Sequence, residues 1–494
     1  MIERTPGIVI AGTGSGSGKT SIAAGIAAHL SRCGLKVQTF KVGPDYLDPT
    51  WLSAASNRQC LNLDSWMCQS EYIRSLYDEE TRDADFSVVE GVMGIFDGAD
   101  PENIKGSTAE AAILLDLPLY LILNVKGTAG TAAAIAKGIR DYDPRLNLEG
   151  IIANYCSSER HRDIIHQALV SNGLPGISAW FSSGELGDLP SRHLGLVSSS
   201  QSRDALNIID LLSQSIRNKV NFNSISSLPD ILNQKDLNET QKIRHTHGNS
   251  VPDGRYLEEY LNKSILHDDQ NKIQMGIAYD EAFSFYYPDN LKMLKALGVR
   301  IIFFSPLNDE IIPEGLDAIY FGGGYPEQFS EKLSENCSMR ESVFEFHKNG
   351  SFIYAECGGL MYLSRSIQNL QEQKDEMTGI FSFSVRMLPR RKALGYMDVE
   401  TRQYGNLETF SLRGHEYHYS EIIDETSARS QYEPVCRIKK RSENNFREEG
   451  FLLNNTYASY VHLHFGSNPR FLKSMIERIE LSKSKVQKSR STIK

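Results

Sequence analysis

The sequence predicts a two-domain α/β protein in which two largely parallel β-sheets are each covered by helices. Its 494 residues exceed what one ordinary hydrophobic core accommodates. Short apolar runs rich in β-branched residues alternate with amphipathic stretches in both halves of the chain, which is typical of parallel sheets packed between helices. A polar stretch over residues 217–272 separates the two series.

The first domain is expected over residues 1–216. Its predicted strands cover residues 8–11, 37–42, 86–92, 117–125 and 148–154. Helical apolar spacing fills the intervals between them, most clearly over residues 21–34 and 130–142. This order of elements indicates a doubly wound sheet, in which ligands bind beyond the carboxyl ends of the strands.

Residues 217–272 are interpreted as a linker or insertion, because they hold eight Asn residues and few apolar runs. A short helix is expected within them near residues 256–266. The second domain is expected over residues 273–480, and its predicted strands cover residues 273–279, 299–304, 316–321 and 351–356. Residues 481–494 carry five basic side chains and no acidic ones, so we expect a solvated basic tail.

Composition narrows the classes of partner and compartment. The formal net charge of -9 gives no reason to expect nucleic acid. No apolar run approaches the roughly 20 residues that span a bilayer, so no membrane partner is expected. The first residues have the pattern of a strand and not of a secretion signal. The seven cysteines are scattered without a C-x-x-C pair, which favours a reducing cytoplasm over a disulfide framework.

A glycine-rich loop follows the first predicted strand and precedes a helix. Its sequence, GTGSGSGKT over residues 12–20, resembles a phosphate-binding loop, although Thr13 stands where glycine is usual. Gly16 and Gly18 would let backbone amides surround a phosphate chain at the helix N-terminus. Lys19 would neutralise phosphate charge, and the Thr20 hydroxyl would bind Mg²⁺. The loop therefore predicts ATP binding, and Asn154, which closes the run 148–154, is expected at the same site.

Carboxylates follow two of the predicted strands in this domain. Glu90 ends one strand and precedes a loop that contains Asp97, while Asp45 and Asp48 follow another strand. Nucleotide-bound Mg²⁺ needs only one or two protein carboxylates in addition to phosphates and water. We therefore expect Thr20, Asp45 and Glu90 to be the metal ligands.

A second reactive site is predicted at Cys357, in the sequence YAECGGLMYL between a strand and a helix. Such an elbow holds a nucleophile in a strained turn, and the following helix start is expected to lower the thiol pKa. Gly358 is one of the small neighbours that this turn requires. Gly323 and Gly324, in the upstream loop GGGYPE, would offer amide donors to a tetrahedral oxyanion.

The base that activates this cysteine is expected near the C-terminus. His462 and His464 lie two residues apart in YVHLH, so on a strand both would face the same side. We favour His462 and keep His464 in reserve. His415 and His418 form a rival pair.

The two sites together indicate one combined reaction. A phosphate loop alone is typical of an NTPase, and a cysteine elbow alone of a hydrolase or acyl transferase. In one chain they suggest that ammonia is made at one site and a carboxylate is activated at the other. Phosphoryl transfer would turn that carboxylate into an acyl phosphate, which ammonia can displace.

The order of these motifs resembles the cobyrinate a,c-diamide synthase family of the vitamin B12 pathway. The segments that carry the resemblance span nearly the whole chain outside residues 217–272: AGTGSGSGKT, FKVGPDYLDP, VVEGVMGIFDG, GSTAEAA, LPSRHLGL (189–196), DEAFSFYYPDNL, FFSPLNDE, YFGGGYPE, YAECGGLMYL and RGHEYHYS. The resemblance implies a P-loop, dethiobiotin-synthetase-like ATP domain followed by a flavodoxin-like class I glutamine amidotransferase domain. It also implies two amidations, of the a and c acetate groups of a corrin ring, with ATP, Mg²⁺ and L-glutamine.

The resemblance further implies roles for individual residues. Cys357 is the nucleophile and His462 its activator, while Tyr46, Asp48 and Asp97 are expected to meet the tetrapyrrole. Many glutamine amidotransferases have a glutamate two residues after the histidine, where this chain has His464. Asn124 stands where aspartate is usual. Both departures leave part of the site unassigned.

Several alternatives remain open from the sequence. The same amidation could act on metal-free hydrogenobyrinate or on nickel-sirohydrochlorin, because the amidated side chains lie at the edge of the ring. A partitioning-type P-loop ATPase switch would need neither Cys357 nor a C-terminal histidine. A degenerate amidotransferase would use free ammonia. The oligomeric state is open, and a homodimer is one arrangement that the sequence allows.

Overall fold

The computed structural model describes residues 4–187, 189, 199–221, 225, 228–229, 273–402, 408–441 and 443–492. The chain divides into two compact units, residues 1–251 and 252–494. Most of the expected linker 217–272, the short helix expected near 256–266 and most of the motif 189–196 lie outside the described residues. No helix in the described ranges has the length and apolar character needed to cross a membrane.

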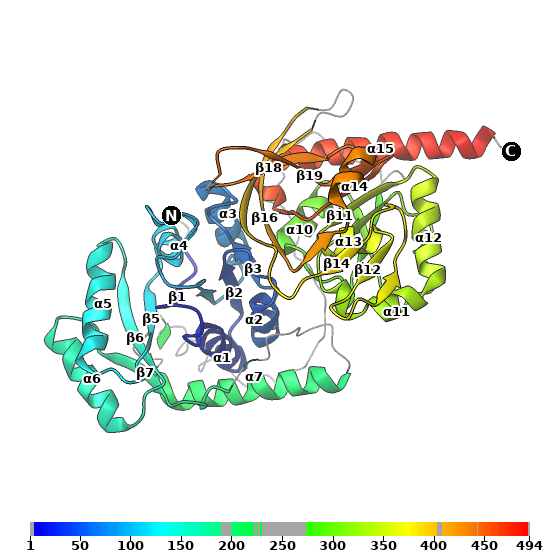
Figure 1. The fold of residues 1–494 in the computed structure, drawn as a ribbon. Helices are drawn as coiled ribbons and strands as arrows, with labels where there is room; N and C mark the ends of the chain where they lie inside the picture. Colours follow the sequence, from blue (N-terminus) through cyan, green and yellow to red (C-terminus); the bar gives the residue numbers. More distant parts are fainter. Residues whose placement is uncertain are drawn as a thin grey trace. The chain divides into compact units, whose positions relative to one another are not determined.

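The first unit is built on a parallel sheet of seven strands in its described part, with the order β3-β2-β4-β1-β5-β6-β7 (Figure 1). The strands are β1 (Gly7–Gly12), β2 (Val37–Val42), β3 (Leu61–Leu63), β4 (Phe86–Glu90), β5 (Leu119–Asn124), β6 (Leu148–Asn154) and β7 (Ile177–Phe181). The helices are α1 (Lys19–Arg32), α2 (Asp48–Ser56), α3 (Ser70–Glu80), α4 (Thr108–Leu115), α5 (Gly130–Tyr142), α6 (Glu159–Ser171) and α7 (Ser199–Lys219). All five strands and both helices predicted for this domain are confirmed, whereas the short β3 and the later β7 were not foreseen.

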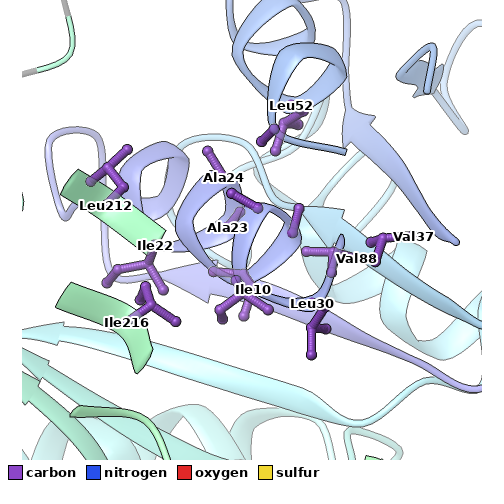
Figure 2. Close-up of a cluster of buried hydrophobic side chains, with 14 of the residues drawn as sticks. Ile10, Ile22, Ala23, Ala24, Leu30, Val37, Leu52, Val88, Leu212 and Ile216 are labelled. Atoms are coloured by element: carbon purple, nitrogen blue, oxygen red, sulfur yellow. The ribbon is translucent and has the colours of Figure 1, made fainter. Parts of the chain in front are cut away.

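Helix α1 contributes many residues to a core cluster of the first unit. Its apolar face, including Ile22 and Ala23, packs on Ile10 of β1, and Leu212 and Ile216 of α7 cover the other side (Figure 2). Gly25 permits this close approach of α7, because a Cβ placed there would lie 2.6 Å from Cγ1 of Ile216. The packing fixes the first turn of α1, and therefore the loop before it, against the sheet.

The second unit contains a six-stranded sheet in its described residues, with the order β20-β21-β11-β10-β8-β9. The neighbours are parallel except for the hairpin of β20 and β21. Its strands are β8 (Gln274–Ala278), β9 (Arg300–Phe304), β10 (Ala318–Phe321), β11 (Phe352–Glu356), β20 (Phe451–Leu453) and β21 (Thr456–Ser459). The helical elements are α10 (Pro288–Ala296), η3 (Pro326–Gln328), α11 (Ser330–Glu335), α12 (Cys337–Lys348), α13 (Gly358–Leu363), α14 (Glu425–Gln431), η4 (Phe465–Ser467) and α15 (Pro469–Thr492). All four strands predicted for this domain are confirmed.

Two small, mostly antiparallel sheets accompany this central sheet and were not foreseen. One, with the order β13-β12-β14-β17, contains β12 (Ser366–Gln368), β13 (Lys374–Glu376), β14 (Val385–Met387) and β17 (Ser420–Ile422). The other, with the order β19-β18-β15-β16-β22, contains β15 (Ala393–Thr401), β16 (Ser411–His418), β18 (Cys436–Lys440), β19 (Arg447–Glu449) and β22 (His462–Leu463). At the C-terminus, helix α15 continues to Thr492, so the stretch expected to be a frayed tail is helical there.

Candidate active sites

The loop between β1 and α1 has the backbone geometry of a phosphate cradle. Gly16 and Gly18 have φ values of 73° and 96°, which only glycine adopts without strain. The Lys19 ammonium lies across the loop, where it donates to the carbonyl oxygens of Gly14 at 2.9 Å and Met93 at 2.7 Å. Burial and the neighbouring Lys41 lower the pKa of Lys19 to about 8. An anion bound here would favour the charged form of Lys19.

A buried ion-pair network adjoins this loop. The Thr20 hydroxyl donates to Oε1 of Glu90 at 2.7 Å. The same carboxylate oxygen accepts from the Lys41 ammonium at 2.8 Å, and Lys41 also donates to Oδ2 of Asp48 at 2.6 Å. Burial by itself would lower the pKa of Lys41, but Glu90 and Asp48 outweigh it and raise that pKa, so Lys41 stays protonated. The network holds both carboxylates at the C-terminal edge of the sheet.

This arrangement fits a magnesium ion. Oε2 of Glu90 is buried and has no hydrogen-bond partner among the residues that the structure describes. Carboxylate and hydroxyl oxygens are the ligands that Mg²⁺ takes beside nucleotide phosphates, and Thr20 supplies the hydroxyl. One carboxylate oxygen of Asp45 is bonded to the backbone instead: Oδ1 accepts from the amides of Leu47 at 2.7 Å and Asp48 at 3.1 Å. Asp48 pairs directly with Lys41, and Asp45 is close enough to raise the pKa of Lys41 as well.

The remaining expected residues of the first unit lie around the same loop. The Asp97 carboxylate accepts from the Gly94 amide at 2.8 Å and so closes the loop that follows β4. This loop pairs with the phosphate loop through a β-bridge between Gly94 and Thr13. Asn154 donates to the Ser17 carbonyl at 2.9 Å. Tyr46 is half-buried between Asp45 and Asp48. By contrast, Asn124 is exposed, and its side chain accepts from the Lys126 amide.

In the second unit, Cys357 lies in the predicted elbow between β11 and α13. Its backbone has φ 47° and ψ -100°, which is strained for a residue with a side chain. The Cys357 amide donates to the Ser459 carbonyl at 2.7 Å, and the Gly359 amide donates to Gly322 at 3.0 Å. These bonds hold the turn in place, as a nucleophile elbow requires.

The thiol pKa differs from the expectation. Burial, followed by the nearby carboxylate of Glu327, raises the pKa of Cys357 well above its usual range. The helix that was expected to lower this pKa is α13, which has only six residues and a correspondingly weak N-terminal dipole. Activation of Cys357 therefore depends on a base that removes its proton.

The upstream glycine loop approaches the cysteine elbow. The amide nitrogen of Gly324 lies 3.1 Å from the position that a Cβ on Gly358 would occupy. The amide of Gly323 instead donates to the Phe285 carbonyl at 3.3 Å, so it is not available to an oxyanion and that part of the expectation is corrected. Gly323 has another role, because a Cβ there would lie 2.2 Å from Cε1 of His462.

His462 is the histidine that the structure places at this loop. It lies on β22, and its ring stacks on His415 with centroids 4.9 Å apart. His464 is turned to other partners, since Nε2 lies 3.2 Å from Oδ2 of Asp289 and Nδ1 accepts from the Gly466 amide. His418 stacks on Tyr460 and contacts the Ser420 carbonyl. The geometry therefore favours His462 over its three rivals.

Two residues near these sites were missed by the sequence reasoning. Lys41 and Glu356 are charged groups in fully buried strands, β2 and β11, and are only 2% and 1% exposed. That contrast is a sequence signal, because a charge in a buried parallel strand requires a partner. Glu356 directly precedes Cys357, and its Oε2 lies 3.8 Å from Nδ1 of His462.

Comparisons with known proteins agree with this division into two sites. Residues 8–181 match the family described as "CobQ/CobB/MinD/ParA nucleotide binding domain", and residues 274–470 match "CobB/CobQ-like glutamine amidotransferase domain". These matches cover the two units that hold the phosphate loop and the cysteine elbow.

Relatives of similar length share both units. A protein of Syntrophotalea carbinolica named cobyrinate a,c-diamide synthase is 43% identical over 96% of this chain and 98% of its own length. Proteins with the same name from Leptospira interrogans and Priestia megaterium are 36% and 34% identical, over 97% and 96% of this chain and 99% and 97% of their own lengths. Identity at this level, extended over both units and including the glycine loop and the cysteine elbow, shows that the chain belongs to the cobyrinate a,c-diamide synthase family.

Proposed function

We propose that this chain is an ATP- and glutamine-dependent ligase that converts the a and c acetate carboxylates of cobyrinate into amides. The single observation that carries the proposal is the presence of both sites in one chain: a phosphate cradle with Lys19, Thr20 and Glu90, and a strained Cys357 beside a glycine loop that contacts His462. Relatives of the same length and both domain matches support it.

In the first unit, the substrate carboxylate attacks the γ-phosphorus of ATP, and ADP departs with the electrons of the broken P–O bond. The amides of the glycine loop and Lys19 hold the phosphate chain and offset its charge. Mg²⁺, which Thr20 and Glu90 would hold, contributes further neutralisation of phosphate charge when bound. Ammonia then attacks the acyl phosphate, phosphate leaves, and the amide forms after loss of a proton.

In the second unit, His462 takes the thiol proton of Cys357, and the thiolate attacks the side-chain carboxamide of glutamine. The amides of Gly324 and Gly358 would stabilise the oxyanion of the tetrahedral intermediate. Collapse of this intermediate, with return of the proton, releases ammonia and leaves a thioester, which water hydrolyses to glutamate.

Partners and setting follow from the same chemistry. L-glutamine and a corrin carboxylate are the substrates beside ATP, and Tyr46, Asp48 and Asp97 are proposed to meet the corrin. None of the seven cysteines, all of which lie in the described ranges, is in a disulfide bond. This supports a reducing, cytoplasmic location. The proposal includes an ATP domain over residues 1–216, a linker or insertion over 217–272 and a glutamine amidotransferase domain over 273–480. It also includes a homodimer.

The test is to incubate the full chain with ATP, Mg²⁺, glutamine and one of three tetrapyrroles: cobyrinate, hydrogenobyrinate or nickel-sirohydrochlorin. Mass spectrometry should record two successive replacements of a hydroxyl by an amino group on cobyrinate, with release of ADP and glutamate. Turnover of only one of the other two rings would move the assignment to that ring. ATP hydrolysis without amidation of any ring would favour a P-loop switch and contradict the proposal.

A further inference from the structure

The buried carboxylate of Glu356 is held in one orientation at the end of β11. Its Oε1 accepts from the Tyr354 hydroxyl at 2.8 Å and from the Leu463 amide at 3.0 Å. Its Oε2 accepts from the Tyr320 hydroxyl at 2.9 Å. With 1% of its surface exposed, the side chain has little freedom to turn elsewhere.

This carboxylate faces the ring of His462. Oε2 lies 3.8 Å from Nδ1, and both side chains are 2% exposed. The bond from the Leu463 amide also ties the residue after His462 to Glu356. Glu356 is therefore bonded to the backbone next to His462, and its carboxylate lies beside the ring.

Another buried acidic group of this unit, Asp289, is paired with a different histidine. Oδ2 of Asp289 lies 3.2 Å from Nε2 of His464. His464 itself stands two residues after His462, where the resemblance leads one to expect a glutamate. The rings of His462 and His415 are stacked, and Nδ1 of His415 is 2.9 Å from the Tyr287 hydroxyl. Neither the contact between Asp289 and His464 nor the contacts of His415 place a negative charge beside His462. An acidic partner of His462 therefore has to come from outside the C-terminal segment.

We propose that Glu356 is the positioning residue of the glutaminase site, and that its carboxylate orients His462 and stabilises the imidazolium formed when the other ring nitrogen, Nε2, takes the proton of Cys357. The proposal rests on the glutaminase half of the function proposed above. Nucleophile and positioning acid are then adjacent in sequence: Glu356 ends the strand and Cys357 begins the turn.

Physical reasons favour this pairing. Burial, followed by His415 and His418, lowers the pKa of His462 well below its usual value, so its cation is costly at rest. A carboxylate beside Nδ1 offsets that cost when the proton arrives and favours the tautomer that leaves Nε2 free to accept it. In this proposal Cys357, His462 and Glu356 have the roles of nucleophile, base and orienting acid.

The same contact gives glutamine hydrolysis a dependence on pH. Burial raises the pKa of Glu356 to about 7, against the opposing effects of the Leu463 amide, the Tyr354 and Tyr320 hydroxyls and the charge of His464. The other titratable groups that face it are Tyr286, His462 and Cys357. Below pH 7 Glu356 is neutral and gives no support to the imidazolium, so hydrolysis should rise as the pH rises through about 7.

The experiment compares Glu356→Gln and Glu356→Asp with wild type in the full chain. Glu356→Gln keeps the size of the side chain but places an amide donor or a neutral oxygen beside His462. We expect kcat for glutamine hydrolysis to fall about 10²-fold with KM for glutamine within about twofold, and the rise near pH 7 to disappear. Ammonia-dependent amidation by Glu356→Gln should be unchanged. Glu356→Asp, which keeps a carboxylate, should have a kcat for glutamine hydrolysis at least about tenfold higher than that of Glu356→Gln.

Asp289→Asn is the matched control, because it also neutralises a buried carboxylate beside a histidine of the same segment. It is expected to lower the melting temperature without changing the ratio of glutamine- to ammonia-dependent activity. If Asp289→Asn and Glu356→Gln lost glutamine hydrolysis equally, and in proportion to the fall in their melting temperatures, Glu356 would have only a structural role. Wild-type kcat and pH profile in Glu356→Gln would overturn the proposal directly.

Wild type and Cys357→Ala are assayed in parallel to separate the two proposals. If wild type hydrolyses glutamine and Cys357→Ala does not, the proposed glutaminase stands, and the Glu356 variants decide only its positioning residue. Absence of glutamine hydrolysis in the wild type would overturn both.

Discussion

The two candidate sites of this chain differ in the charge state of their buried groups. In the first unit, Lys41 is charged at rest and paired with Glu90 and Asp48, close to Lys19. In the second unit, Cys357 and His462 are buried, and burial favours the neutral form of both. The first site thus holds charged groups at rest, whereas in the proposed reaction the second becomes charged only while glutamine reacts. One chain can keep two very different polar environments because each lies at the strand ends of its own sheet.

The largest effect is expected from Cys357→Ala, which removes the proposed nucleophile of the second site. Glutamine-dependent amidation should fall at least about 10³-fold, while amidation supplied with ammonium salts continues at the wild-type rate. Product formation with each nitrogen source is the measurement. Cys436→Ala, which shortens another buried cysteine of the same unit, is the control and should retain glutamine use. Unchanged glutamine turnover in Cys357→Ala would reassign the nucleophile.

Lys19→Ala tests the first site, and here both nitrogen sources should fail together. Loss of the ammonium that faces the phosphate chain is expected to reduce amidation about 10²- to 10³-fold with glutamine or with ammonia. Initial rates of ADP release report the effect. Lys137→Ala, at an exposed position of α5, should behave as wild type. Retained amidation with ammonia and ATP would count against this loop as the site of activation.

Gly323→Ala should disturb the second site alone. The added methyl group would lie 2.2 Å from Cε1 of His462, so the ring has to move away from its position. A displacement of this size is expected to lower kcat for glutamine hydrolysis about 10²-fold while ammonia-dependent amidation is preserved. Equal loss with both nitrogen sources would indicate that the substitution affects more than the histidine.

The smallest effect concerns the scaffold of the first unit. In Gly25→Ala the new Cβ would lie 2.6 Å from Cγ1 of Ile216 and 3.2 Å from the Leu212 carbonyl. Overpacking at this helix contact should cost about 1–3 kcal/mol in the free energy of unfolding. Gly138→Ala is the matched substitution on α5, where a Cβ meets no atom within 4 Å. It should stabilise by about 0.5–1 kcal/mol. Chemical denaturation of both variants measures the contrast.

Short segments of sequence were enough to predict the local backbone structure at both candidate sites. The loop over residues 12–20 and the turn at Cys357 are local, because a strand, a few glycines and a helix start define each of them. The nine predicted strands were found for a related reason, since buried parallel strands are continuous apolar runs. His462 was favoured over His464 already from the sequence, and His462 is the one that lies against the glycine loop; its role as the base stays a prediction.

What could not be predicted depends on contacts between distant segments. The pairing of Lys41 with Glu90 joins strands 49 residues apart, and that of Glu356 with His462 joins β11 to β22. The predicted direction of the Cys357 pKa shift was wrong. Burial raises this pKa more than the N-terminus of the six-residue helix α13 lowers it, and burial cannot be read from the sequence. The small sheets were missed since several of their strands have only three residues, too few to establish a period.

The burial of Cys357 also bears on how the enzyme withstands oxidants. Peroxide attacks the thiolate and not the thiol, so a sulfur that stays protonated between turnovers is a poor target for sulfenic acid formation. Cys33 and Cys337, in contrast, are exposed on the surfaces of their units. Damage in aged preparations should therefore collect first on these two surface sulfurs, and the nucleophile should outlast them.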